Sequence, residues 1–122
     1  MATTYGTRVW ALDGMRQQVN DIQLIGTDGT TVHNTQGVAV SDFDISFQGG
    51  NNPELYLNNN KTLTVGDGTT IGYIRLVLFD ETITGQNELA YIDYQIGGAS
   101  GEEFPDGGEI EVTSFEVQLN DI

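Results

Sequence analysis

Carboxylates are the most abundant groups in this chain that could carry chemistry. Asp42 and Asp44 alternate along an expected strand and share one face about 7 Å apart, a separation that an acid–base pair of a glycosidase could use. The apolar residues of that strand lie on the other face, so we expect both carboxylates to be solvated. Adjacent acids such as Asp80–Glu81 and Glu102–Glu103 are expected by chance in so acidic a chain.

A calcium site is the strongest metal hypothesis, because calcium prefers oxygen ligands supplied by loops. The segment Glu102-Glu103-Phe104-Pro105-Asp106-Gly107 could supply Glu102, Glu103 and Asp106 as ligands. The chain has no EF-hand spacing and no Gly-Gly-x-Gly-x-Asp repeat, so a solvated acidic loop is the alternative. We expect no other cofactor.

Nucleophilic catalysis finds few suitable residues. His33 is the sole histidine, the chain has no cysteine, and no serine lies in a Gly-x-Ser-x-Gly sequence. His33 follows an expected hairpin and is typical of a surface strand residue. We therefore expect no catalytic residue and no enzyme activity.

The charge balance excludes whole classes of function. Eighteen acidic residues face four basic ones, giving a net charge of −14, and residues 76–122 hold no Lys or Arg. Nucleic acids and anionic lipids both require clustered cations, so we expect binding to neither. A surface that mimics DNA, or a halophilic source, would also be acidic, and these alternatives stay open.

Hydrophobic residues recur with period two, which predicts short β-strands. The pattern predicts one all-β domain over residues 8–122, an antiparallel sandwich or small barrel of about eight short strands with at most one short helix. The helix, if present, is expected over residues 13–19. Strands are expected at residues 7–12, 21–25, 31–34, 38–47, 54–57, 62–65, 71–79, 89–96 and 110–119, and residues 97–108 are expected to form a polar loop.

Turn residues and changes of pattern divide the expected strands. Asp28-Gly29 and Asp67-Gly68 each predict a β-hairpin. The apolar face switches near Ser41–Asp42 and again near Thr113–Ser114, which predicts a bulge or bend at both places. The strand over residues 71–79 is apolar on both faces and is therefore expected at the centre of a sheet.

The first seven residues are polar and are expected to form an N-terminal arm. They contain no charged region followed by an apolar run, so no signal peptide is expected, and the longest apolar stretch, Leu76–Phe79, is too short to span a bilayer. We expect a cytoplasmic origin.

The chain resembles small virion structural proteins of tailed phages. The resemblance lies in the Met-Ala-Thr-Thr start, in Thr/Gly/Asn-rich hairpins such as Val65-Gly66-Asp67-Gly68-Thr69-Thr70, in the lack of cysteine and in the small β domain. It implies a capsid decoration (cement) protein located in the virion, bound to the major capsid protein and to copies of itself, with a trimer favoured. Tail tube proteins are similar too, but they contain a helix packed on the sheets and are longer.

The same resemblance implies a docking surface at the start of the chain. Tyr5, Arg8 and Trp10 are the expected interface residues, with Trp10 as the anchor that buries against the capsid. The acidic residues after Leu76 would face solvent. A calcium- or carbohydrate-binding sandwich module is the remaining alternative, since Trp10, Tyr56, Tyr91 and Tyr94 could stack on sugars.

Overall fold

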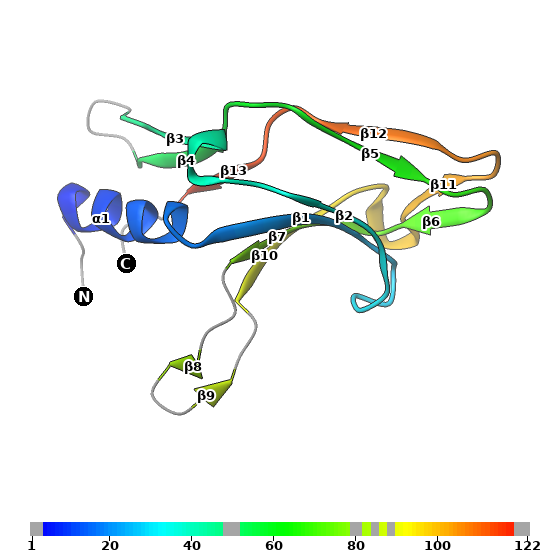
Figure 1. The fold of residues 1–122 in the computed structure, drawn as a ribbon, viewed down its shortest axis with the longest axis horizontal. Helices are drawn as coiled ribbons and strands as arrows, with labels where there is room; N and C mark the ends of the chain where they lie inside the picture. Colours follow the sequence, from blue (N-terminus) through cyan, green and yellow to red (C-terminus); the bar gives the residue numbers. More distant parts are fainter. Residues whose placement is uncertain (1–3, 48–51, 79–81, 84–85, 88–89, 119–122) are drawn as a thin grey trace.

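The computed structural model describes residues 4–47, 52–78, 82–83, 86–87 and 90–118. These residues form one α-helix, thirteen short strands and two 3-10 turns, and every strand pairs antiparallel (Figure 1). The predicted all-β sandwich is confirmed, and the described strands close into no barrel. The strands outnumber the predicted eight because bends split several of the expected runs.

The helix α1 (Tyr5–Arg16) begins at the N-cap Thr4, whose Oγ1 accepts a hydrogen bond of 3.1 Å from the Thr7 backbone N–H. Its buried residues, Arg8 and Leu12, recur one turn apart on the side that packs on β3 (Phe43–Ser46) and β4 (Glu54–Leu57). At its last turn the Arg16 Nε donates to the Phe43 carbonyl oxygen at 2.7 Å, which fixes the helix along β3.

The prediction for the start of the chain was wrong. Residues 7–12 were expected to form a strand and residues 13–19 a helix, but the helix spans residues 5–16. Residues 5–7 of the expected arm form its first turn, while residues 1–3 lie outside the described residues. Local propensity is weak here, so the burial of Leu12 and Arg8 against β3 and β4 decides the conformation.

The first layer is a four-stranded sheet with the order β10-β7-β1-β2. Its strands are β1 (Val19–Ile25), β2 (Val32–Gly37), β7 (Tyr73–Leu78) and β10 (Tyr91–Gln95). The prediction of a central strand is confirmed for β7, which lies between β1 and β10 and is buried from Ile74 to Val77. The hairpin predicted at Asp28-Gly29 is confirmed as the β1–β2 connection.

The second layer holds the three-stranded sheet β13-β4-β3 and the pair β12-β5, in which β5 spans Lys61–Val65, β12 spans Gly108–Val112 and β13 spans Glu116–Gln118. Both predicted bends fall where the chain leaves one sheet for another. The 3-10 turn Val40–Asp42 carries the chain from β2 to β3, and residues 113–115 separate β12 from β13. The switch of the apolar residues from one strand face to the other therefore marks the place where the chain passes from one sheet to another.

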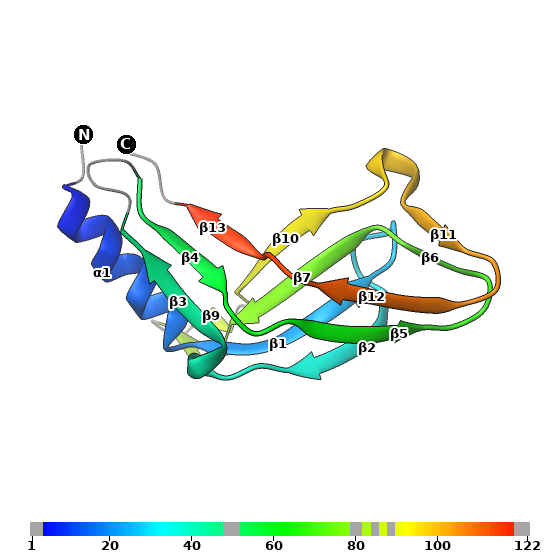
Figure 2. The ribbon, with the colours of Figure 1, turned by 90° about the horizontal axis from the view of Figure 1, so that it is seen from above.

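The end of the molecule opposite α1 differs from prediction (Figure 2). Asp67-Gly68 forms a turn between β5 and β6 (Thr69–Ile71), but these strands do not pair with each other: β5 pairs with β12, and β6 pairs with β11 (Glu102–Phe104). The expected loop over residues 97–108 contains β11 and the 3-10 turn Gly98–Ser100. The backbone N–H of Gly68 donates to the carbonyls of Phe104 and Pro105 at 2.9 and 3.1 Å, which holds the two turns together.

A further hairpin extends from the first layer. The strands β8 (Thr82–Ile83) and β9 (Gln86–Asn87) pair with each other and project away from the sandwich beyond β7 and β10 (Figure 1).

The core lies between the two layers and one flank of it is closed. Asn34 on β2 donates from Nδ2 to the Thr64 carbonyl of β5 at 2.9 Å, joining the layers at that flank. The opposite flank, between β10 and β12, has no such bridge in the part of the chain that the structure describes. The largest fully buried apolar side chains are Phe43, Leu12, Ile22, Leu24, Ile25, Leu55, Leu63, Ile71 and Leu76.

Candidate functional site

Trp10 is the most exposed large hydrophobic residue among those the structure describes, with 78% of its surface accessible. Residues two apart on a helix lie about 200° apart, so Trp10 faces away from both Arg8 and Leu12, which are buried against the second layer. Gly6 and Gly14 lie one turn before and after it on the same side, and outside the adjoining helix backbone no described atom lies within 4 Å of where their β-carbons would be. The indole therefore projects from a helix face whose positions one turn before and after it are glycines, here called the Trp10 face (Gly6, Trp10, Gly14).

The other two residues expected at the interface lie on a different side of the helix. Arg8 is 9% exposed, and its guanidinium lies 6.0 Å from the centre of the Tyr5 ring. Arg8 is buried on the side of α1 that packs on β3 and β4. The structure therefore brings Tyr5 and Arg8 together and leaves Trp10 as the member of the trio that faces solvent.

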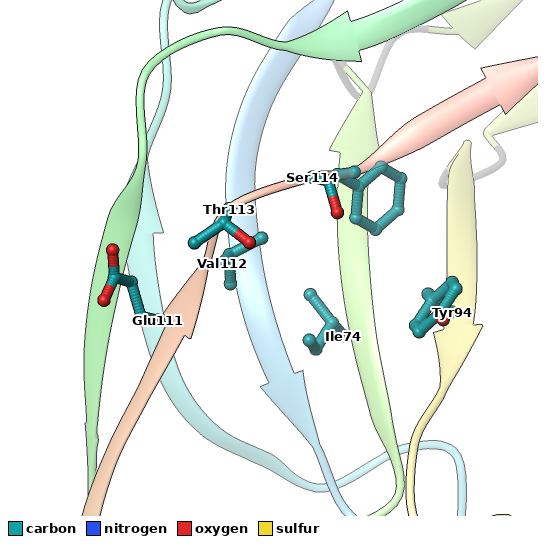
Figure 3. Close-up of a pocket in the computed structure, with 7 residues that line it drawn as sticks. Ile74, Tyr94, Glu111, Val112, Thr113 and Ser114 are labelled. Atoms are coloured by element: carbon teal, nitrogen blue, oxygen red, sulfur yellow. The ribbon is translucent and has the colours of Figure 1, made fainter.

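A cleft opens on the flank of the sandwich between β10 and the β12–β13 connection (Figure 3). Ile74 and Tyr94 contribute from the first layer, facing Val112 and Ser114 of the second layer. The cleft has a volume of about 170 Å³, and Tyr94 beside it remains 60% exposed. Its lining residues are Ile74, Tyr94, Glu111, Val112, Thr113, Ser114 and Phe115.

The edge of β10 beside this cleft leaves its backbone groups open. The Leu78 N–H donates to the Ala90 carbonyl and the Ile96 N–H to the Gly72 carbonyl, so even-numbered residues of β10 point their backbone groups at β7. The odd-numbered residues Tyr91, Asp93 and Gln95 point theirs outward. Within the described residues, no strand pairs with this outer edge. The cleft and this edge form one accessible flank.

The three residues predicted as calcium ligands lie on β11 and the turn after it. Glu102 and Glu103 are adjacent on a strand, so their side chains point to opposite faces, and Asp106 lies in the following turn. No cluster of three or more His, Asp or Glu side chains suited to a metal occurs among the described residues. Calcium binding stays a prediction.

Asp42 is not solvated, contrary to prediction. It is 7% exposed and accepts hydrogen bonds of 2.8 Å from the Ala39 N–H and from Asn59 Nδ2, while Lys61 Nζ lies 3.3 Å away. The backbone hydrogen bond from Ala39, with the help of Asn59 and Lys61, lowers the pKa of Asp42 below its ordinary value despite its burial. This carboxylate ties the β2–β3 turn to the β4–β5 connection and has a structural role.

The remaining candidates for chemistry lie on the surface. Asp44 is exposed and accepts a hydrogen bond of 2.5 Å from Asn58, while Asp80 and Glu81 lie outside the described residues. His33 is exposed on β2, as predicted, beside a shallow hollow formed with Asp28 and Thr31. Asp28 caps its own turn through hydrogen bonds from Thr30 and Thr31, and these bonds lower its pKa.

The outward face of the second layer is acidic. Leu55, Val117 and Val112 point into the core, so the alternate residues of their strands point outward. The strand register places Tyr56 between Asp44 and Glu116, with no basic residue in that row. The carboxylates on this face are Asp44, Glu54, Glu109, Glu111 and Glu116.

The search for similar proteins leaves this fold and its surfaces without a named relative. No family model, no curated protein and no solved structure matches the chain. Among the described residues, no helix has both the length and the apolar composition needed to cross a bilayer.

Proposed function

We propose that this protein is a virion structural protein that works by docking onto its neighbours, with capsid decoration as the first candidate. Under this proposal the Trp10 face binds the major capsid protein or another copy of the chain. The observation that carries the proposal is the 78% exposure of Trp10, because tryptophan is among the residue types most enriched as anchors at the centre of protein interfaces.

The glycines beside Trp10 support the same reading. A glycine inside a helix costs about 1 kcal/mol relative to alanine, and no atom of the chain occupies the space around Gly6 or Gly14. The isolated fold gains nothing from this cost. Glycines beside an aromatic anchor favour docking, because the absence of their side chains lets a partner approach the helix closely.

The acidic outward face of the second layer fits a surface that remains in solvent. Its carboxylates, with a net charge of −14 for the whole chain, repel other particles and keep an assembly dispersed. This face is opposite in character to the Trp10 face, which supports a subunit that docks through one surface and presents the other to solvent.

A tail tube or other tail structural protein is the second candidate, and a specific observation favours it. The resemblance to tail tube proteins included a helix packed on the sheets, and α1 is a twelve-residue helix that packs on β3 and β4. The extended β8–β9 hairpin also offers an element that could reach a neighbouring subunit (Figure 1). Both candidates require docking, and they differ in the partner.

Co-sedimentation with particles tests the proposal. Phage heads and tails lacking this protein are mixed with the purified chain or with Trp10→Ala, and the pellet is quantified. We expect the wild-type protein to pellet with one kind of particle and Trp10→Ala to bind at least tenfold more weakly, while Val32→Ala, an exposed apolar residue of β2, binds normally. Equal binding by wild type and Trp10→Ala, or no binding to either particle, would contradict the proposal.

A further inference from the structure

The outer edge of β10 has the features of a strand that pairs with another strand (Figure 2). Tyr91, Asp93 and Gln95 point their backbone N–H and C=O groups away from β7, and within the described residues no strand lies against them. Soluble proteins protect such edges with lysine, proline or a bulge. The sequence of β10 is Tyr-Ile-Asp-Tyr-Gln, and its register with β7 is regular throughout, so it carries none of these protections. Its open backbone groups suit an added strand.

The charge on this edge is balanced. Asp93 is the one charged residue of β10, and Arg75 neutralises it through contacts of 2.7 and 2.9 Å. The edge strands β11, β12 and β13 differ, because their glutamates form no ion pair among the described residues. These glutamates are Glu102, Glu103, Glu109, Glu111 and Glu116. Two copies that each carry a net charge of −14 repel through such strands, whereas two β10 strands bring no uncompensated charge together.

Exposed aromatic residues are concentrated on the same strand. Of the five large hydrophobic side chains that are exposed among the described residues, Tyr91 and Tyr94 both belong to β10, with 48% and 60% of their surfaces accessible. They point to opposite faces of the sheet, because their positions differ by an odd number. Pairing of this edge with another strand would cover part of both rings.

The backbone restricts how a second β10 could pair with the first. Odd-numbered residues must lie opposite odd-numbered residues, because only these bond outward. An axis of two-fold symmetry at Asp93 would place the two Asp93 carboxylates opposite each other, which is unfavourable. An axis at Tyr94 instead places Asp93 opposite Gln95 of the second copy, whose side-chain amide can donate to the carboxylate. The two-fold symmetry forms this pair twice.

The other face of the strand also matches itself in this register. Tyr94 lies opposite Tyr94 of the second copy, and Ile92 lies opposite Ile96 of the second copy. Aromatic pairs and pairs of β-branched residues are favourable across neighbouring strands. Ile92 and Ile96 already pack against the core, and Tyr94 lies beside the cleft with Ile74, so this row continues the apolar face of the sheet (Figure 3). A register centred on Ile92 would set Tyr94 opposite the small side chain of Ala90.

We infer that β10 pairs antiparallel with β10 of a second copy around a two-fold axis at Tyr94. The pairing joins the four-stranded sheets of the two copies into one continuous sheet. Both copies use the same surface, so the contact closes at a dimer and does not grow into a filament. The inference uses neither Trp10 nor the virion role proposed above, and it names a second interface on a different part of the molecule.

Sedimentation velocity from low micromolar to near-millimolar concentration tests the pairing. Wild type is expected to form a dimer as concentration rises. Gln95→Pro removes one outward N–H and should weaken the dimer at least tenfold, while the bonds between β10 and β7 remain because that N–H points away from β7. Trp10→Ala and Val32→Ala are controls that lie outside the edge and should dimerise like wild type. Circular dichroism and thermal unfolding establish that each variant is folded.

Disulfide trapping tests the register independently of stability. The chain has no cysteine, so a single introduced cysteine can form a disulfide only between two copies. In the inferred register the two Tyr94 Cα atoms lie about 4.5 Å apart, within the range that a disulfide spans. The two Tyr91 Cα atoms lie about 20 Å apart, six residues out of register. Under oxidised glutathione, Tyr94→Cys should cross-link at least tenfold faster than Tyr91→Cys, an exposed position of the same strand.

Three results would overturn the inference. They are a wild-type protein that is monomeric at every concentration, a folded Gln95→Pro protein that dimerises like wild type, and a Tyr94→Cys protein that cross-links no faster than Tyr91→Cys. A monomeric wild type that binds particles through Trp10 overturns the inference and supports the virion role. A protein that dimerises through β10 but binds no particle supports the inference and contradicts the virion role.

Discussion

Arg75 and Asp93 lie directly opposite each other on β7 and β10 and form an ion pair with two contacts. The Arg75 Nε lies 2.7 Å from Oδ1 of Asp93, and Nη2 lies 2.9 Å from Oδ2. The same Nη2 donates to the Gly29 carbonyl at 2.9 Å, and the guanidinium lies 3.8 Å from the centre of the Tyr91 ring. The hydrogen bonds that Arg75 donates to the Asp93 carboxylate raise the pKa of Arg75, so the buried guanidinium stays charged. This cluster fixes the β1–β2 loop to the sheet.

Breaking this pair should destabilise the fold strongly. Asp93→Asn leaves a guanidinium that is 6% exposed without its counter-charge, and we expect the free energy of unfolding to fall by about 2–4 kcal/mol in urea denaturation. The double variant Arg75→Leu/Asp93→Leu should recover part of this loss, because it removes the uncompensated charge. A double-mutant cycle with no coupling between the two positions would show that the pair is unimportant.

Asp42 should make the protein sensitive to acid. Its pKa is lower in the folded than in the unfolded chain, so its stabilising contribution is complete above the ordinary aspartate pKa of 3.8 and disappears as pH falls through that value to the lowered one. Asp42→Asn should cost about 2 kcal/mol at pH 7, because Lys61 and the Ala39 N–H lose a charged partner. Urea denaturation between pH 7 and pH 3 measures both effects.

The difference between wild type and Asp42→Asn should shrink as pH falls below 3.8, because protonation of Asp42 in the unfolded chain removes the stabilising contribution of the folded carboxylate. Asp44→Asn is the matched control, since that carboxylate lies two residues away and is exposed. We expect it to change stability by less than about 0.5 kcal/mol at every pH. A constant difference between wild type and Asp42→Asn across this pH range would contradict the account of Asp42.

Substitution of Gly14 should change the stability of the fold and its binding to particles in opposite directions. No atom lies within 4 Å of the position of its missing β-carbon, so Gly14→Ala should stabilise the monomer by about 0.5–1 kcal/mol through helix propensity. The added methyl group lies on the Trp10 face and should weaken particle binding. Chemical denaturation and co-sedimentation measure the two properties on the same variant. Unchanged binding would show that the flat face has no role.

Gly72 should tolerate no side chain. It lies between β6 and β7, and its backbone N–H donates to the Ile25 carbonyl at 2.7 Å. A β-carbon there would lie 2.8 Å from the Cα atom of Thr27, closer than real contacts allow. We expect Gly72→Ala to lower the free energy of unfolding by about 1–3 kcal/mol, measured by chemical denaturation. Wild-type stability would mean that the β1–β2 loop shifts freely.

The sequence predicts the strands of the first layer well, because the side chains that are buried in these strands are the apolar residues of the sequence pattern. The run over residues 71–79 is apolar on both faces, and β7 is the central strand of its sheet. The switch of apolar face near Ser41 correctly marks a bend. The pairing of strands that are distant in the sequence is not predictable in this way. Asp67-Gly68 indicates a turn, but only tertiary packing determines that β5 pairs with β12.

The helix and the cleft were missed for physical reasons. Residues 9–12 form an unbroken apolar run, and Gly6 and Gly14 lower the helix propensity on either side, so the periodicity of the helix is hard to see. The spacing of Tyr5, Leu12 and Met15 is helical and is the signal for α1 in the sequence. The cleft combines Ile74 with Ser114, forty positions apart, and no local pattern could have joined them.

The most direct test of the central claim is the copy number of this protein in purified virus particles, measured by quantitative mass spectrometry against the major capsid protein. We predict a stoichiometric signal, with many copies in every particle, that is lost when the gene carries Trp10→Ala. Complete absence of the chain from intact particles, with all of it recovered free in the lysate, would contradict the account.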